Sequence, residues 1–462
     1  MNYKNIQKAG LTFIAIFALW AGSAGAEVSL EEAAKLQTIL TPLGAERAGN
    51  AQGTIPAWEG GYTTVDPSFK QGGTRNDPFA SDKVLFSITA QNMDQYADRL
   101  TEGTKEMFRL YPDTYRLDVY QTRRTASAPQ WVYANTAENA VKGIIVEGNA
   151  GPKPANVYGG IPFPIPQNGE EIMWNHLLSW RGSSSSVDFQ QFLIAADGKQ
   201  VMVGGGTFFL DRPYHHEDSN LEQYLKEYPN EDYRKVYILT TAPPLRAGSQ
   251  IVGGSCLDAT RASTYVYLPG QRRVRKLPNA CCDTPSTTCA GIMTYDELYV
   301  WDERIDRFNW KIMGKKEMYI PYNTNRYFTL EQPADAMSKH HLNPDHLRWE
   351  LHRVWVVEAE LAPGKRHQLP KGRYYLDEDT WLAVLGDRWD SNDQLAKMMW
   401  GLPYVLPDMP GVCTKTSGFY DFTSKAWFVL DSFIGLDKQI EFVDNIPKSK
   451  FSPRAMAGRG VK

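Results

Sequence analysis

The chain has 462 residues and a formal net charge of −3 at pH 7. This mild acidity argues against a nucleic-acid partner, because binding to a phosphate backbone relies on a surplus of Lys and Arg. The length allows a large core, and the 24 Tyr, 19 Phe and 13 Trp favour strands. We therefore expect a β-rich protein built as one large domain or two smaller ones.

The first 26 residues have the pattern of a secretory signal peptide. Lys4 and Lys8 precede an apolar run at 11–21, and small residues at 24–26 form a cleavage pattern before Glu27. The run is too short for a stable anchor, and no later segment is apolar enough to cross a membrane. No Cys follows the run, which excludes lipidation at that site. We expect export to the periplasm, with a mature chain that begins at Glu27.

The N-terminal part of the mature chain predicts a helix and an extended arm. Ser29 and Glu32 form a capping box that opens a helix ending near Leu40. Residues 48–61 are too rich in Gly and Ala for a core strand, so we expect an arm that lies on the domain. A short strand at 84–88 and a helical stretch at 93–108 follow.

A Pro- and Gly-rich stretch at 149–169 is interrupted by aromatic and aliphatic residues, which favours an ordered loop or lid over a linker. Asn168 caps the helix predicted at 170–180, which is unusually apolar and must be covered by other parts of the protein. If the sheet encloses a cavity, this helix and the loop before it are the best lid. The candidate cavity residues are Ile161, Phe163, Ile165, Trp174, Leu177, Leu178, Trp349 and Trp355.

From residue 187 onward the chain reads mostly as hairpins. Strands at 187–195 and 200–203 flank Asp197-Gly198, a strong hairpin signal. More than ten strands in antiparallel order, with few helices, predict a large curved sheet or an open barrel. The further predicted strands are 233–241, 264–268, 272–277, 308–313 paired with 317–321, 400–406, and a hairpin at 418–430.

The most regular stretch begins at Trp349. Between 349 and 361 apolar residues fall on alternate positions, apart from Arg353, which predicts a strand with one buried face. Strands at 373–376 and 381–385 flank an acidic turn at 377–380, so three strands form a meander. The opposite face of the first strand is predicted to meet water; it carries Glu350, His352, Glu358 and Glu360.

Five of the eight His residues gather in one region together with Asp345 and Glu350: His340, His341, His346, His352 and His367. A metal site is one interpretation, but no spacing matches a helical His-Glu-x-x-His pattern and Pro344 interrupts any single helix. We favour polar residues on a turn and on the wet face of a strand. No metal and no cofactor are predicted.

Acidic residues near the meander offer a second chemical possibility. Asp377 and Asp379, with Asp387 and Asp390, could supply a carboxylate pair for acid and base catalysis. Acidic residues are common in turns, however, and the chain has no Gly-x-Ser-x-Gly elbow, phosphate-binding loop or dinucleotide fingerprint. We predict no catalytic residues and keep a hydrolase that uses this His and Asp cluster as an alternative.

Five Cys lie in the mature chain: Cys256, Cys281, Cys282, Cys289 and Cys413. In an exported protein the cluster ACCDTPSTTC, together with Cys256, favours one or two disulfides among the first four. A zinc site is the alternative, although the paired Cys spacing typical of such sites is missing.

One basic run stands out: Arg272, Arg273, Arg275 and Lys276. We favour an exposed edge strand that its charges protect from pairing. A patch for an acidic partner or for phospholipid head groups remains the alternative.

Long stretches of the chain resemble a family of bacterial periplasmic proteins, domain of unknown function 1329, whose members are often labelled outer-membrane lipoprotein-sorting proteins. The resemblance runs from about residue 40 to 454. The Cys-rich insert departs from the family's pattern. The matching stretches are LTPLGAERAGNAQGTIPAWEGG, NMDQYADRLTEG, YPDTYRLDVYQTRR, EIMWNHLLSWRG, STYVYLPGQRRVRKLPN, DRFNWKIMGKKEMYIPYN, LRWELHRVWVVEAEL and YYLDEDTW.

The resemblance implies a single domain at 27–462, with a helix and arm at 27–80, an open-barrel core at 81–454 and a tail at 455–462. It also implies a mainly β (α+β) fold similar to the periplasmic lipoprotein carriers, an incomplete antiparallel barrel whose helices cover an apolar cavity. We therefore expect a non-enzymatic carrier of a lipid or other hydrophobic molecule, working with an inner-membrane export pump and an outer-membrane barrel. A structural subunit of an envelope complex is a further alternative.

Overall fold

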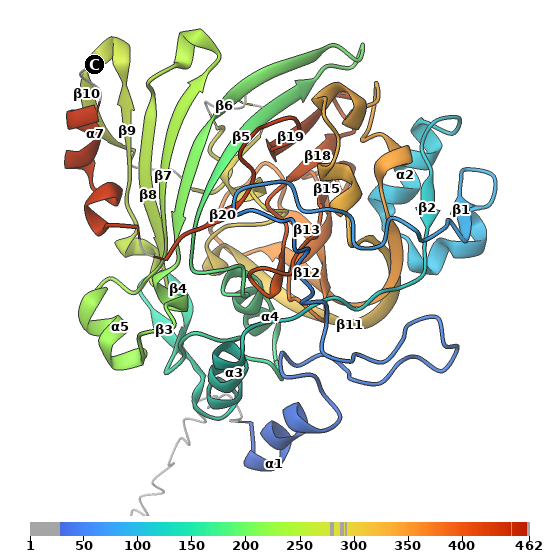
Figure 1. The fold of residues 1–462 in the computed structure, drawn as a ribbon, viewed down its shortest axis with the longest axis horizontal. Helices are drawn as coiled ribbons and strands as arrows, with labels where there is room; N and C mark the ends of the chain where they lie inside the picture. Colours follow the sequence, from blue (N-terminus) through green and yellow to red (C-terminus); the bar gives the residue numbers. More distant parts are fainter. Residues whose placement is uncertain (1–27, 278–280, 287–290, 292, 445, 460–462) are drawn as a thin grey trace, which may run out of the picture.

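Figure 1 shows a computed structural model that describes residues 28–277, 281–286, 291, 293–444 and 446–459. The expected signal peptide and Cys289 lie outside the described residues. The fold is mainly β, as predicted: one 16-stranded, mostly antiparallel sheet dominates, accompanied by short helices. Its strands follow the order β1-β2-β12-β13-β14-β15-β18-β19-β5-β6-β7-β8-β9-β10, with β11 beside β12 and β20 beside β5.

The sheet is not closed. Within the described residues β10 pairs only with β9, and at the other end β1 pairs only with β2 and β11 only with β12, so the two ends of the sheet do not meet. The strands of the large sheet are β1 (Phe86–Ile88), β2 (Leu117–Val119), β5 (Ser184–Ile194), β6 (Gln200–Asp211), β7 (Asp232–Ala242), β8 (Gln250–Cys256), β9 (Thr264–Leu268), β10 (Arg273–Leu277), β11 (Phe308–Pro321), β12 (Trp349–Leu361), β13 (Lys371–Asp377), β14 (Ala383–Trp389), β15 (Leu395–Gly401), β18 (Ser417–Asp421), β19 (Trp427–Ser432) and β20 (Glu441–Phe442).

The described residues also form two small hairpins, seven short α-helices and several 3-10 turns. Along the described part of the chain, no helix combines the length and the apolar character that crossing a membrane would need. The hairpins are β3 (Ile144–Gly148) with β4 (Gly151–Ala155) and β16 (Tyr404–Leu406) with β17 (Gly411–Cys413). The helices are α1 (Leu30–Ala33), α2 (Glu102–Leu110), α3 (Gln130–Lys142), α4 (Gly169–Leu177), α5 (Leu221–Glu227), α6 (Asn325–Phe328) and α7 (Pro453–Arg459).

The middle of the sheet forms the main core. Strands β12, β14, β15 and β19 are buried along nearly their whole length, on both faces. One face is covered in part by the N-terminal segment, which contributes buried Leu43 and Ile55 to the main core. The Trp381 indole donates to the carbonyl of Leu43 at 2.7 Å, and the Trp58 indole donates to that of Ala126 at 2.8 Å. The N-terminal segment therefore helps to shield the middle of the sheet from solvent.

Strands β5 to β10 form a wing that extends away from the main core (Figure 1). Alternate residues of each strand point to opposite faces. On one face Phe209 and Tyr237 pack with Phe451 and Met456 of the C-terminal segment, so α7 and the turn before it cover that face. On the other face Phe208, with its neighbours on β5 and β7, forms a separate apolar cluster. The cavities described below lie on that second face.

Three predictions about elements need correction. Residues 308–321 form one strand, β11, rather than a hairpin, because Gly314, with φ of 106°, accommodates a bulge and lets the strand pair with all of β12. The strand predicted at 200–203 continues to Asp211 as β6, so the glycines at 204–206 lie inside it. A Cβ on Gly206 would lie 2.0 Å from the carbonyl oxygen of Leu239, so the close pairing with β7 requires glycine there.

The third correction concerns the face of β12 that was predicted to meet water. Glu360 is exposed, but Glu350 and His352 are buried. The Glu350 carboxylate accepts hydrogen bonds from His352 Nε2 at 3.0 Å, from Asn323 Nδ2 at 2.8 Å and from Arg348 Nε. Burial alone would raise its pKa, but the hydrogen bond from His352 and the charge of Arg348 lower it. The alternation of polar residues was predicted correctly, but Glu350 and His352 meet a buried ion-pair cluster instead of water.

Candidate cargo cavities

Two adjoining cavities lie between the wing and a roof segment, the described residues 281–286 and 293–305. The first has a volume of about 190 Å³ and the second about 380 Å³. Both are lined by Arg234 of β7, by Gly254 and Ser255 of β8, and by Leu298 of the segment. The shared wall makes the two spaces neighbours along one face of the sheet.

The first cavity is mainly apolar. Its floor is the inner face of β5 to β8, and its roof includes Met293 and Leu298. Paired glycines on β6 and β8 carry no side chains that could fill it, which opens the space in an otherwise well-packed protein. The apolar lining residues of the sheet are Phe189, Phe208, Val236, Ile238, Ile251 and Leu430.

The second cavity is more polar. Helix α4 contributes Trp174 and Leu177, and β8 contributes Cys256. The opposite wall carries charged residues from the segment, including Glu303 and Arg304. A molecule that occupied both cavities would therefore meet an apolar space at one end and a mixed one at the other.

The segment that closes the cavities is tied down by polar contacts. Thr294 and Glu297 form a capping box around a short 3-10 turn, and Lys397 of β15 donates to Glu297 at 2.7 Å. Arg234 of the wing pairs with Asp302 at 2.6 Å. Although burial lowers it, the charge of Asp302 holds the pKa of Arg234 above its usual range. These contacts come from both halves of the sheet and fix the roof between them.

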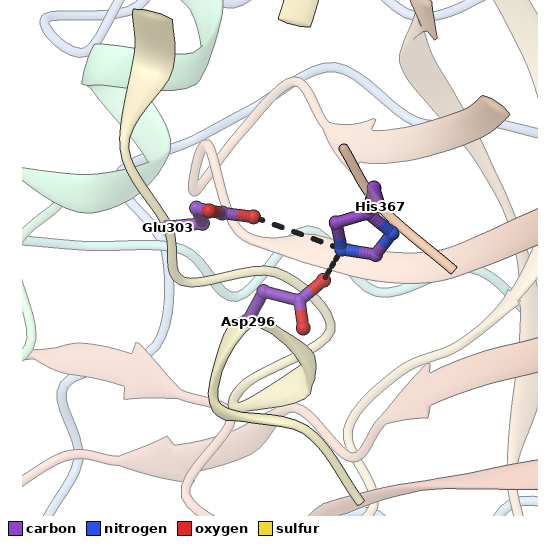
Figure 2. Close-up of side chains that lie close together, drawn as sticks. All are labelled: Asp296, Glu303 and His367. Carbon is purple, nitrogen blue, oxygen red and sulfur yellow. Dashed lines mark hydrogen bonds and ion pairs between the residues drawn. The ribbon is translucent and has the colours of Figure 1, made fainter. Parts of the chain in front are cut away.

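Behind the roof Asp296, Glu303 and His367 meet (Figure 2). Nε2 of His367 lies 3.1 Å from Asp296 and 4.0 Å from Glu303, and all three side chains are buried. Their ligand atoms are close enough together for a divalent cation. However, Arg388 also donates to Asp296, and Arg307 pairs with Glu303 at 3.0 Å. The charge of Arg388 compensates Asp296, whereas burial and the charge of Asp296 raise the pKa of Glu303 to about 8 despite Arg307. The three side chains therefore belong to a structural ion-pair network.

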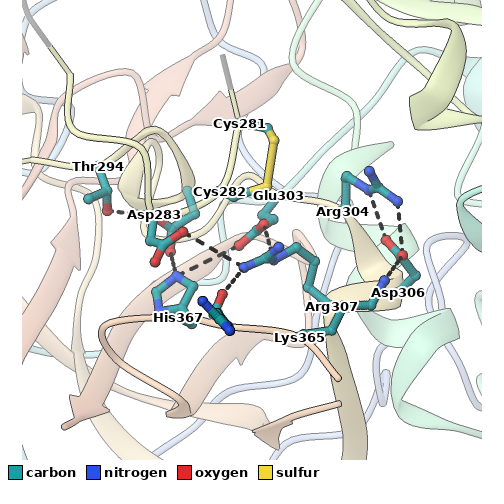
Figure 3. Close-up of a disulfide and its surroundings, with 12 residues drawn as sticks. Cys281, Cys282, Asp283, Thr294, Glu303, Arg304, Asp306, Arg307, Lys365 and His367 are labelled. Carbon is teal, nitrogen blue, oxygen red and sulfur yellow. Dashed lines mark hydrogen bonds and ion pairs between the residues drawn. A yellow bond between two sulfur atoms is a disulfide. The ribbon is translucent and has the colours of Figure 1, made fainter. Parts of the chain in front are cut away.

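The Cys281–Cys282 bond lies next to this network (Figure 3). It joins two of the four cysteines that were disulfide candidates and leaves Cys256 and Cys413 as buried free thiols. The disulfide remains a prediction that chemistry has to test. In the same view Asp306 pairs with both Arg304 and Lys365, at 2.9 and 2.8 Å, which anchors the end of the segment.

The histidines that cluster in the sequence separate in the fold. His341 is buried beside Thr114, so the prediction that it would be exposed on a turn is wrong. The reason is that its ring packs against Tyr115. His352 lies in the core of the meander and His367 behind the roof. These histidines therefore do not form one shared metal site.

A second group, His352 with Asp377 and Asp379, also places three ligand atoms close together. Asp379 is held by two hydrogen bonds from Arg124, at 2.6 and 2.9 Å. Burial and the neighbouring Asp379 raise the pKa of Asp377. Its carboxylate accepts from Thr380 at 2.7 Å and closes the predicted acidic turn. The acidic turn therefore has a structural role: its carboxyl groups accept the hydrogen bonds that close and anchor the turn.

The predicted cavity residues take different positions. Trp174 and Leu177 line the second cavity. The other six are Ile161, Phe163, Ile165, Leu178, Trp349 and Trp355, and none of them is in the lining of either cavity; most are buried in the main core or packed against it. Helix α4 ends at Leu177 rather than at Trp180, so its last predicted turn belongs to the core.

Sequence reasoning missed the residues of the wing. The floor of the first cavity comes from β5, β6 and β7, which were predicted at least in part, and from β8, which was not predicted. The face that these strands turn to the cavity was not predicted either. A signal was present: the glycines at 204–206 and 253–254 interrupt strand-forming stretches, which marks places where a sheet lacks side chains.

Comparison with known proteins identifies the family of the chain. Residues 87–457 match the family described as protein of unknown function (DUF1329). The chain belongs to the DUF1329 family. This DUF1329 protein is 37% identical to the uncharacterized protein PA3922 of Pseudomonas aeruginosa over 459 residues, which is 98% of each chain.

Solved structures resemble parts of this DUF1329 protein at low sequence identity. A DUF1329 family protein from Desulfovibrio piger covers 62% of this chain and 97% of its own, with 12% identity and a TM-score of 0.43. An outer-membrane lipoprotein-sorting protein domain from Vibrio parahaemolyticus covers 63% and 98%, with 12% identity and a TM-score of 0.42. The LolA superfamily protein NE2245 from Nitrosomonas europaea covers 62% and 98%, with 10% identity and a TM-score of 0.37.

Proposed function

We propose that this protein is a non-enzymatic carrier that binds a lipid or another hydrophobic molecule in the two cavities beneath the roof segment, residues 281–286 and 293–305. The observation that carries the proposal is the first cavity, an apolar space on the inner face of β5 to β8 inside a protein whose main core is densely filled. Pockets for small ligands measure about 300–1,000 Å³, a size that the first cavity reaches together with the adjoining second one.

The driving force for binding is burial of apolar surface. Each methylene group that leaves water for the cavity contributes about 0.8 kcal/mol, so a chain of several carbons supplies ample binding energy. Val236 and Ile238, which project from β7 toward the first cavity, supply such a surface. Trp174 and Leu177 extend it into the second cavity.

The setting of the proposed carrier is the periplasm. The secretory pattern at 1–26 supports export, and the mature chain is expected to begin at Glu27. A carrier there has to shield its cargo from water between two membranes. A roofed cavity does this better than an open groove. An inner-membrane export pump and an outer-membrane barrel are the partners we expect to supply and receive the cargo.

The proposal is tested by binding of a fluorescent fatty acid, cis-parinaric acid, to the purified mature protein, together with mass spectrometry of an organic extract. We expect saturable binding and a co-purifying apolar molecule. A protein that binds no apolar probe and yields no extractable lipid would contradict the carrier and leave the structural-subunit interpretation. Hydrolysis of an added ester in step with protein concentration would instead favour the hydrolase.

A further inference from the structure

A third, smaller cavity adjoins the first one and differs from it in charge. It has a volume of about 30 Å³, and Tyr299 lines both spaces. Three cationic side chains line it: Arg181, Arg212 and Lys415. Their charges make this the most basic enclosed space of the described protein that adjoins the proposed cargo site.

Two of the three cations have no acidic partner. Arg181 donates to the hydroxyl of Ser179 at 2.9 Å and to the carbonyl of His176 at 2.5 Å. Arg212 donates to the carbonyls of Arg181 and Gly182, both at 3.3 Å. Within the described ranges neither guanidinium has a carboxylate at ion-pair distance. Neutral carbonyls hold the side chains in place but do not cancel their charge.

The nearby carboxylates are already engaged. Asp431 pairs with Lys415 at 2.9 Å, and Asp302 pairs with Arg234 at 2.6 Å. Burial, followed by the charge of Arg234, lowers the pKa of Arg181 to about 10. Burial and the charge of Arg181 lower the pKa of Arg212 to about 9. Both groups remain charged at neutral pH, so the cavity holds uncompensated positive charge at a cost in free energy.

An unpartnered hydroxyl lies in the same wall. Thr414 is 1% exposed, and its Oγ1 has no hydrogen-bond partner in the part of the chain that the structure describes. A buried hydroxyl of this kind normally finds a partner. Thr414 also lines the small cavity, so a bound acceptor there would satisfy it.

The small cavity lies beside the apolar one. The ammonium of Lys415 lies 3.6 Å from the centre of the Phe208 ring, and Phe208 lines the first cavity. Lys415 also donates to the hydroxyl of Tyr299 at 2.8 Å. A ligand with an apolar chain over Phe208 would thus place its end group next to Arg181 and Arg212.

We propose that Arg181, Arg212 and Thr414 form a site for an oxyanion, a carboxylate or a phosphate, and that this group is the head of an anionic amphiphile whose chain lies in the first cavity. The inference rests on the proposed carrier function and narrows its cargo class. Guanidinium groups bind carboxylate and phosphate with charge-assisted hydrogen bonds. The small volume admits one compact head group and excludes a bulky one.

The test compares cis-parinaric acid with its uncharged methyl ester. We expect the wild-type protein to bind the acid about tenfold more tightly or better, the range of one charge-assisted hydrogen bond. Arg212→Gln and Arg181→Gln should bring the acid down to the affinity of the ester while leaving the ester unchanged. Arg212→Lys keeps the charge and should retain part of the preference. Arg273→Gln, on the exposed edge strand, is the matched control.

Inorganic phosphate provides a second arm that needs no apolar cargo. It should raise the melting temperature of the wild type and not that of Arg212→Gln, and circular dichroism should show both folded. Equal binding of acid and ester, unchanged in the variants, would overturn the oxyanion site and leave the carrier intact. Stabilisation by phosphate without binding of either probe would mean a free-anion site and no carrier. No response in either arm would overturn both proposals.

Discussion

The carboxylate of Asp387 on β14 accepts a hydrogen bond from the backbone N–H of Gly103 at 3.0 Å, joining the sheet to the first turn of α2. Its other oxygen accepts from the backbone N–H of Glu102 at 2.9 Å and from the hydroxyl of Tyr375 at 3.2 Å. Burial raises the pKa of Asp387 to about 7. An aspartate that the sequence offered as half of a catalytic pair therefore anchors a helix.

This anchor predicts a pH-dependent stability. The unfolded carboxyl titrates near pH 4 and the folded one near pH 7, so the folded state binds more protons between these values. The contribution of Asp387 is full below about pH 4, and it is lost as pH rises through 7, by up to about 1.4 kcal/mol per pH unit.

The variant Asp387→Asn mimics the protonated carboxyl and should lack this dependence. Urea unfolding of wild type and variant at pH 5 and pH 8 measures it. The difference in unfolding free energy should shift in favour of the variant at pH 8. A difference that is the same at both pH values would contradict the raised pKa.

The roof residue Leu298 lines both cavities, and Leu298→Glu would place an unpaired charge in an apolar space. We expect the affinity for cis-parinaric acid to fall about tenfold or more while far-ultraviolet circular dichroism keeps its β signal. Leu245→Glu is the control, because Leu245 is 97% exposed. Equal affinities in the two variants would show that the probe binds elsewhere.

Helix α4 separates cavity contacts from core contacts. Trp174 lines the second cavity, whereas Leu178 is 1% exposed in the main core. Trp174→Ala should weaken probe binding and cost about 3–5 kcal/mol of stability, because Trp174 is also buried, while Leu178→Ala should leave the affinity unchanged and cost about 2–5 kcal/mol of stability. Urea unfolding and probe titration on the same samples check both. Loss of affinity in Leu178→Ala alone would reverse the assignment.

The pair Arg388 and Asp296 predicts a large loss of stability. Arg388→Met leaves Asp296 buried without its strongest cation, which should cost about 3–5 kcal/mol. Adding Asp296→Asn should recover part of that loss, because the unpaired charge is then gone. Arg273→Met, at an exposed position, should change stability by about 0.5 kcal/mol or less. An equally small effect of Arg388→Met would contradict a buried ion pair.

The cysteines predict an order of reactivity. Burial, followed by the charge of Asp232, raises the pKa of Cys256 to about 12, and burial also raises that of Cys413. Neither thiol should react with iodoacetamide in the native protein, because reaction needs the thiolate. In denaturant both should react at once, while Cys281 and Cys282 should react only after reduction. Labelling of the adjacent pair before reduction would exclude their bond, and release of zinc would favour the metal site.

Local pattern carried much of the fold. The alternation at 349–361 and the acidic turn at 377–380 predicted the meander in its correct order, because an alternating strand and an Asp-closed turn are decided by neighbouring residues. Asn168 likewise marked the start of α4. The bulge at Gly314 was missed because only pairing with β12 over its full length distinguishes a bulged strand from a hairpin.

By itself the sequence determined that this protein is an antiparallel β protein with an export signal pattern and an apolar surplus, since these follow from composition and period. Only the tertiary structure decided where that surplus leaves a space. Trp349 and Leu178 fill the core, whereas Phe208 and Val236 face a cavity, and all four are equally apolar in the sequence. The roof and the charged end of the site, Leu298 with Arg181 and Arg212, come from segments far apart in the chain. Which side chains meet there depends on how the wing curves against the main core. No local sequence pattern encodes how close such distant segments come to each other.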